Sequence, residues 1–139
     1  MTNGYRLIDH TADFGVEVWA HDAAQLFELA ADVLTGLLFE DCELRGGTHH
    51  RVEIEGQDWA DLMVNWLREL LYLWAGRERI VAGVRIDHLE ETCVRADVST
   101  IGFDPHRHRV RHDIKAVTYH QIQVGPCDQG WCCRVIFDV

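Results

Sequence analysis

The stretch DWADLMVNWLRELLYLWAG, residues 58–76, decides the fold of this chain. Asp58 is a favourable helix N-cap, and Asp61 places an acid in the first turn, where the helix dipole stabilises negative charge. Gly76 is expected to end the helix. Between these ends, apolar residues recur every three or four positions and form one wide face: Leu62, Trp66, Leu67, Leu70, Leu71 and Trp74. The tryptophans of this stretch are therefore expected in a core rather than in a cofactor site.

A second amphipathic helix is expected upstream, from Asp22 to about Phe39. Asp22 is its N-cap and Gln25 the capping-box partner three residues later. The remaining apolar segments alternate with a period of two, as strands do, over 5–9, 15–20, 51–55, 80–88, 92–101, 110–124 and 131–139. Two early helices and a late run of strands predict an α+β fold, with two main amphipathic helices packed on a mostly antiparallel sheet.

Length and composition bound the class of protein. The chain has 139 residues, of which 47% are hydrophobic, and this favours one folded domain spanning 1–139. No apolar run reaches the length of about 18 residues that a membrane span needs. The first residues, MTNGYRLIDH, lack the layout of a signal peptide, so we expect a cytoplasmic protein without a membrane partner.

The charge balance disfavours direct binding of nucleic acid. The chain carries 23 acidic against 13 basic side chains, a formal net charge of −10. Proteins that bind RNA or DNA gain affinity by neutralising phosphates with Lys and Arg, so little or no direct nucleic-acid binding is expected. An acidic surface suits docking onto a basic partner protein, and the acids around Asp61 and Glu69 are candidates for that contact.

Carboxylates occur at both ends of the chain. HTADFG, residues 10–15, contains Asp13, and the sequence ends with Asp138 and the terminal carboxylate of Val139. If the fold brings the two ends together, these oxygens favour a hard divalent cation such as Ca²⁺ or Mg²⁺. The alternative is that both aspartates are ordinary strand-end or turn residues.

Five cysteines without a signal peptide are expected to be reduced thiols. Cys127, Cys132 and Cys133 have the residue types of a zinc site. However, neighbouring residues on a strand point to opposite faces, so Cys132 and Cys133 do not readily share one ion.

The only basic cluster is HRHRVRH, residues 106–112. In an extended conformation, His106, His108 and His112 would share one face as a metal-binding ladder; a solvated loop or edge strand is the alternative. His10 and His120 lie beside the other motifs. His10 is a candidate to orient Asp13 by hydrogen bonding or to act as a general base; the alternative is a histidine that packs a turn. No nucleophile motif, zinc-protease motif or phosphate-binding loop occurs, so the sequence does not support independent catalysis.

Four segments in order along the chain resemble the archease family. They are HTADFG (10–15), DLMVNWLRELLYL (61–73), KAVTYHQIQV (115–124) and VIFDV (135–139). The resemblance implies a small α+β accessory protein of an RtcB-type RNA ligase, which acts in tRNA splicing and RNA repair. Such a protein promotes guanylylation of the ligase and lets it turn over repeatedly. The resemblance also implies that Asp13, Asp138 and Val139 bind a divalent cation, described as calcium, and that the protein has no catalytic residues of its own.

Two other functions remain open at this point. One is a metal-dependent hydrolase or nuclease that uses Asp13, Asp138 and either His10 or His120, because two-carboxylate metal sites do perform phosphoryl chemistry. The other is a chaperone-like modulator of a different RNA-processing enzyme. The His/Arg-rich stretch and the cysteines are peculiar to this chain and leave the motif positions untouched.

Overall fold

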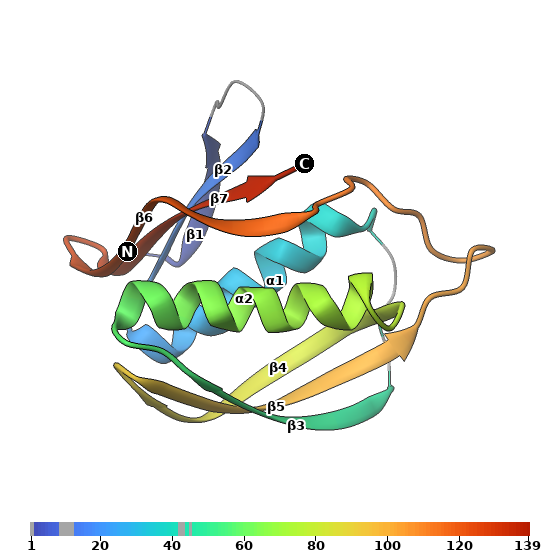
Figure 1. The fold of residues 1–139 in the computed structure, drawn as a ribbon, viewed down its shortest axis with the longest axis horizontal. Coiled ribbons are helices and arrows are strands. Elements are labelled where there is room, and N and C mark those ends of the chain that lie inside the picture. Colours follow the sequence, from blue (N-terminus) through green and yellow to red (C-terminus); the bar gives the residue numbers. More distant parts are fainter. Residues whose placement is uncertain (1, 9–12, 42–43, 45) are drawn as a thin grey trace.

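The computed structural model describes residues 2–8, 13–41, 44 and 46–139. Two helices lie between two antiparallel sheets (Figure 1), so each helix has apolar contacts on both sides. The elements, in chain order, are β1 (Gly4–Ile8), β2 (Asp13–Ala20), α1 (Ala23–Leu38), β3 (Thr48–Glu55), α2 (Trp59–Ala75), β4 (Arg79–Glu90), β5 (Cys93–Gly102), β6 (Ala116–Cys127) and β7 (Gly130–Asp138). The predicted α+β fold, with two helices on antiparallel strands, is confirmed.

The sheets differ in how their strands connect. The three-stranded sheet has the order β3-β5-β4, and the four-stranded sheet has the order β1-β2-β7-β6. In the second sheet, β7 enters between the N-terminal hairpin and β6, so the last strand of the chain pairs with the second one. This arrangement pairs the start of β2 with the end of β7, so Asp13 and Asp138 lie side by side in one sheet.

Both helices begin where the sequence predicts. The carboxylate of Asp22 accepts a hydrogen bond of 2.8 Å from the backbone N–H of Gln25, and Asp58 does the same for Asp61. Asp61 in turn accepts from the backbone N–H of Gln57, so the start of α2 is capped in both directions. These bonds satisfy donors that have no partner inside the helix.

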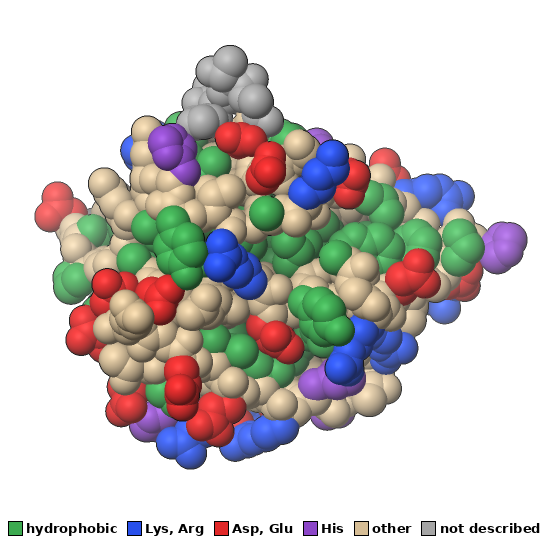
Figure 2. Space-filling model, viewed as in Figure 1, with side chains coloured by type: hydrophobic (Ala, Val, Ile, Leu, Met, Phe, Trp, Pro, Cys, Tyr) green, Lys and Arg blue, Asp and Glu red, His purple; other side chains and the backbone are tan. Residues whose placement is uncertain are grey.

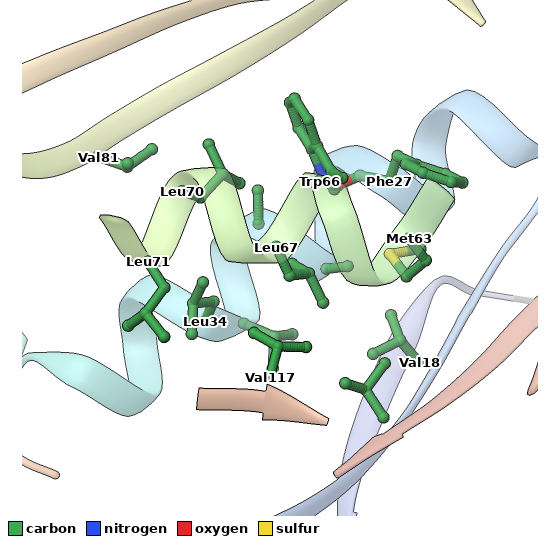
Figure 3. Close-up of a cluster of buried hydrophobic side chains, with 14 of the residues drawn as sticks. Val18, Phe27, Leu34, Met63, Trp66, Leu67, Leu70, Leu71, Val81 and Val117 are labelled. Atoms are coloured by element: carbon green, nitrogen blue, oxygen red, sulfur yellow. The ribbon is translucent and has the colours of Figure 1, made fainter. Parts of the chain in front are cut away.

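The core forms where α1 and α2 meet the sheets (Figure 3). Trp66 is fully buried, and its indole Nε1 donates to the carbonyl oxygen of Phe27 on α1 at 3.0 Å. Trp59 and Trp74 are partly buried and pack against the same core, with Trp59 in an edge contact to Trp131. The expectation that the tryptophans of α2 belong to the core is confirmed.

One predicted strand starts too early. Residues 110–124 were expected to be continuous, whereas β6 runs from Ala116 to Cys127. A turn at 105–107 precedes it, and Val110 forms only an isolated bridge with Phe39. Residues 103–115 instead cross from the three-stranded sheet to the four-stranded one, which a strand continuing β6 cannot do. Among the residues that the structure describes, no helix is long and apolar enough to cross a membrane.

Candidate functional site

Asp13 and Asp138 are directly paired across the β2–β7 ladder. Their position follows from side-chain alternation. Residues of β2 and β7 that point to the helices, such as Val16 and Val135, are buried, whereas Asp13 and Asp138 belong to the opposite set. Both aspartates therefore lie on the outer face of the four-stranded sheet, the face turned away from the helices. Val139 follows directly and is partly exposed.

This register answers a question that the sequence left open. Asp13 of the HTADFG segment and Asp138 of the VIFDV segment lie side by side in neighbouring strands. Like charges directly opposite each other in an antiparallel pair destabilise it, so this pairing favours a positive charge nearby. Carboxylate oxygens are ligands that suit hard cations such as Ca²⁺ or Mg²⁺. Among the described residues, no three His, Cys, Asp or Glu side chains form a group that could hold a metal ion, so a site here needs oxygens beyond those side chains.

Two neighbours of this edge were not foreseen. The backbone N–H of Lys115, the only lysine of the chain, donates to the carbonyl oxygen of Asp138 at 2.8 Å. The His112 ring meets Phe14 edge-on at 4.4 Å between centroids. Lys115 begins the KAVTYH segment, so the signal was present in the sequence. The contact could not be predicted, because Lys115 and Asp138 are far apart in the sequence.

Of the two histidines proposed as site residues from the sequence, the structure describes only His120. His10, with Thr11 and Ala12, lies outside the described residues. His120 is an exposed residue of β6 whose backbone N–H donates to the hydroxyl of Thr118 at 3.2 Å.

Residues 106–112 do not form a histidine ladder. The chain turns at 105–107, and His108 is buried beside Phe103. Its Nδ1 accepts from the backbone N–H of Asp104 at 2.8 Å, so this ring stabilises the loop. His106 is exposed, and His112 packs on Phe14. The loop alternative is confirmed.

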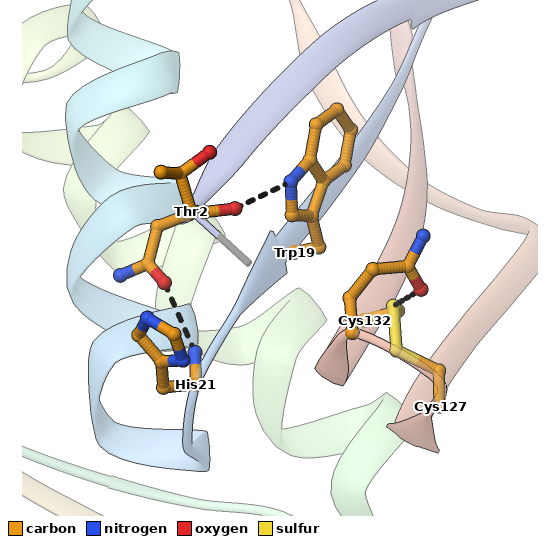
Figure 4. The surroundings of a disulfide bond; sticks show 7 residues. Thr2, Trp19, His21, Cys127 and Cys132 are labelled. Atoms are coloured by element: carbon orange, nitrogen blue, oxygen red, sulfur yellow. Dashed lines mark hydrogen bonds between the residues drawn. A yellow bond between two sulfur atoms is a disulfide. The ribbon is translucent and has the colours of Figure 1, made fainter.

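The cysteines give one correction. Cys127 and Cys132 form a disulfide across the β6–β7 hairpin, with Cα atoms 5.9 Å apart (Figure 4), so the expectation of reduced thiols is wrong for this pair. The short turn at 128–129 brings the two strands within disulfide range. Cys133 points into the core, and burial raises the pKa of its thiol to about 12. Cys132 and Cys133 therefore face opposite ways, as the argument against zinc required.

Asp61 accepts hydrogen bonds from two groups of the protein itself. Its carboxylate accepts from the Tyr119 hydroxyl at 2.7 Å, and this hydrogen bond, followed by the one from the backbone N–H of Gln57, lowers the pKa of Asp61. Arg68 lies over the Tyr119 ring at 4.7 Å. The contact ties the start of α2 to β6.

Comparison with known proteins places these features in one family. The model of the Archease protein family (MTH1598/TM1083) matches residues 5–139. The chain belongs to the archease family. An archease of Archaeoglobus fulgidus is 31% identical, with 97% of this chain and 98% of that protein covered. An archease of Methanosarcina acetivorans is 29% identical, with 97% and 95% covered.

The archease fold is also evident in three dimensions. The solution structure of Methanobacterium thermoautotrophicum protein 1598 matches with a TM-score of 0.78 at 27% identity, over 98% of this chain and 99% of that one. The resemblance to archeases seen in four motifs thus extends to the whole fold.

Proposed function

We propose that this archease-family protein activates an RtcB-type RNA ligase in tRNA splicing and RNA repair. It promotes guanylylation of the ligase and its multiple turnover, and it performs no catalysis itself. Membership of the archease family is the observation that carries the proposal. The chain supplies no nucleophile paired with a base in its sequence motifs, so the chemistry belongs to the partner.

The pairing of Asp13 with Asp138 supports a divalent cation at this edge, with calcium as the first candidate and Mg²⁺ as the second. Asp13, Asp138 and the Val139 carboxylate would provide its ligands. A bound cation would supply positive charge that removes the repulsion between the two facing aspartates. The residues of the chain do the rest: β2 and β7 hold the carboxylates in register, and the sheet fixes their direction.

Charge supports a protein partner. Figure 2 shows one face of the molecule, on which acidic side chains are spread in several groups with basic ones among them. With a net charge of −10, the protein is attracted to a basic enzyme and repelled by RNA. We place the protein in the cytoplasm, with the ligase rather than RNA as its direct contact.

The test is a guanylylation assay with purified ligase, GTP and divalent metal. Asp13→Ala is expected to abolish the stimulation that the native protein gives, while its circular dichroism spectrum stays native. Asp128→Asn is the matched control, because Asp128 is an exposed acid in the β6–β7 turn, remote from the paired aspartates. Full stimulation by Asp13→Ala would refute the role of the cation.

Two further measurements separate the alternatives. Calorimetric titration with Ca²⁺ is expected to show weaker binding when one residue is added after Val139, because the addition moves the terminal carboxylate. Unchanged affinity would remove Val139 from the site. Incubation of the protein alone with RNA and Mg²⁺ is expected to leave the RNA intact, and cleavage would favour a nuclease.

A further inference from the structure

A groove of about 530 Å³ lies on the outer face of the four-stranded sheet, away from the paired aspartates. Its floor includes a row of residues that are paired across all four strands: Arg6, Glu17, Arg134 and Gln123. The next row along the strands contains Trp19 and Gly125. Along β7, Arg134 is four residues from Asp138, about 13 Å in an extended strand, so the groove and the candidate cation site are separate.

The groove carries a net positive charge, whereas the chain as a whole is negative. Two guanidinium groups meet one carboxylate: Arg6 donates to one oxygen of Glu17 at 2.8 Å, and Arg134 donates to the other at 2.8 Å. One positive charge is therefore uncompensated in this row of a protein that is strongly acidic overall. The hydrogen bond from Arg134 is the main reason that the pKa of Glu17 is lowered, so Glu17 stays ionised at neutral pH.

Arg134 has hydrogen-bonding capacity that the protein does not use. Among the described residues, its Nε–H is the one buried side-chain polar group without a hydrogen-bond partner. An unpaired buried donor is destabilising, and a ligand that accepts from it removes that cost. The Arg134 side chain is at the same time about one-third exposed and lines the groove. An oxyanion there accepts from Nε and a terminal nitrogen together, in the forked geometry that guanidinium groups prefer.

The rest of the groove combines apolar groups with the side chain of Gln129. The Trp19 indole lies against Gly4, where a Cβ atom would come within 2.7 Å of the ring, and its Nε1 donates to the carbonyl oxygen of Thr2 (Figure 4). Beside it is the Cys127–Cys132 disulfide. A Cβ atom added at Gly125 would meet nothing within 4 Å, so the space above this part of the floor is open.

We propose that this groove binds a small anionic ligand, an oxyanion of the carboxylate or phosphate type attached to a flat apolar body. The oxyanion accepts hydrogen bonds from Arg134 and Arg6 in place of Glu17, and the apolar body lies over Gly125, between Trp19 and the Cys127–Cys132 disulfide. The volume lies within the range of small-molecule sites, and such sites combine apolar walls with a few fixed polar groups. Glu17 acts as an internal competitor that holds the two arginines in place when no ligand is bound.

The test is titration of the whole, oxidised protein followed by ¹H–¹⁵N NMR. The probes are phenyl phosphate, benzoate and neutral benzyl alcohol. Saturable shifts of the Arg134 Nε–H and Gly125 amide signals are expected with an anion and not with the alcohol. The stronger of the two anions identifies the ligand as a phosphate or a carboxylate, and either result supports the site.

Three variants and a control make the result specific. Gly125→Val fills the open space, and Arg134→Gln removes the charge; each is expected to abolish the shifts. Glu17→Gln removes the competitor and is expected to tighten binding about tenfold, the equivalent of one charge-assisted hydrogen bond. Arg107→Gln is the control, since Arg107 is exposed in the turn at 105–107.

Three outcomes would overturn the proposal. They are no saturation with either anion, equal binding of the alcohol, and undiminished binding by both Gly125→Val and Arg134→Gln. The two variants change different rows of the groove, and the dispersion of their spectra reports whether each has folded. Glu17→Gln adds a gain of affinity, which a loss of folding does not produce.

Discussion

The Tyr119 hydroxyl on β6 donates a 2.7 Å hydrogen bond to the carboxylate of Asp61 in the first turn of α2. The bond joins the helix layer to the four-stranded sheet. It lies at an irregular part of β6, where pairing with β7 is interrupted between Thr118 and Gln123. It also couples two titrations: the same bond lowers the pKa of Asp61 and raises that of Tyr119.

We expect Tyr119→Phe to lower the melting temperature slightly at neutral pH and to change how stability depends on pH. A lowered carboxyl pKa contributes stability above the unfolded value of about 4, and this is lost as pH falls through the folded pKa. A raised phenol pKa contributes below about pH 10 and is lost as pH rises. The native protein and the variant should therefore converge in strong acid. Thermal melts across pH test this, and a constant difference between the two would contradict it.

The facing of Asp13 and Asp138 predicts a reversal of stability with calcium. Without divalent cations, Asp138→Asn is expected to stabilise the fold by up to about 1 kcal/mol, because it removes a like-charge pair. At a calcium concentration one hundred times the dissociation constant, the native protein gains about 2.7 kcal/mol that the variant largely lacks. Thermal melts with EDTA and with Ca²⁺ measure both effects. An unchanged order of stability in the two buffers would count against the cation site.

Trp66 predicts the cost of disturbing the core. Trp66→Phe removes both ring volume and the hydrogen bond to the Phe27 carbonyl, so we expect a loss of about 2 kcal/mol in the free energy of unfolding. Trp59→Phe is the matched control on the same helix, because Trp59 is only partly buried and should cost less. Urea denaturation measures both. Equal losses of unfolding free energy in the two variants would contradict the expectation that the more deeply buried Trp66 contributes more.

The disulfide predicts a thiol count and a stability change. Non-reducing titration of the unfolded protein should find two thiols fewer than titration after reduction. The bond links residues five apart in sequence, and closing so short a loop contributes about 2 kcal/mol, the loss expected for the double variant Cys127→Ser and Cys132→Ser. In the folded protein, the Cys133 thiol should not react, because burial keeps it protonated. Rapid labelling of Cys133 would contradict its placement.

The sequence predicted those parts of the fold that depend on local patterns. The N-caps Asp22 and Asp58, the buried face of α2 and most strand positions follow from capping chemistry and apolar periodicity, which act over a few residues. The start of β6 was misplaced because Val110 and its neighbours alternate like a strand, yet they are needed to connect the two sheets. Only the tertiary arrangement decides between these uses.

The candidate sites divide in the same way. Asp13 and Asp138 were found from motifs, but their pairing depends on β7 entering the sheet beside β2, a long-range choice that periodicity does not report. The groove was missed because Arg6, Glu17 and Arg134 lie far apart in sequence and only the register aligns them. The disulfide was missed because the assumed compartment, rather than the hairpin geometry, set the expectation.

The position of β7 also constrains the order of events during synthesis. The N-terminal hairpin of β1 and β2 leaves the ribosome first, yet its inner partner, Gly130–Asp138, is made last. The three strands of the other sheet all lie within residues 48–102, so that sheet has its partners earlier. The four-stranded sheet, with both aspartates and the groove, is therefore completed only after its final strand emerges from the exit tunnel. In a nascent chain stalled before Gly130, β2 would lack its partner β7 and would be open to pairing with other strands. A chaperone that binds such a chain would be expected to cover this edge of β2.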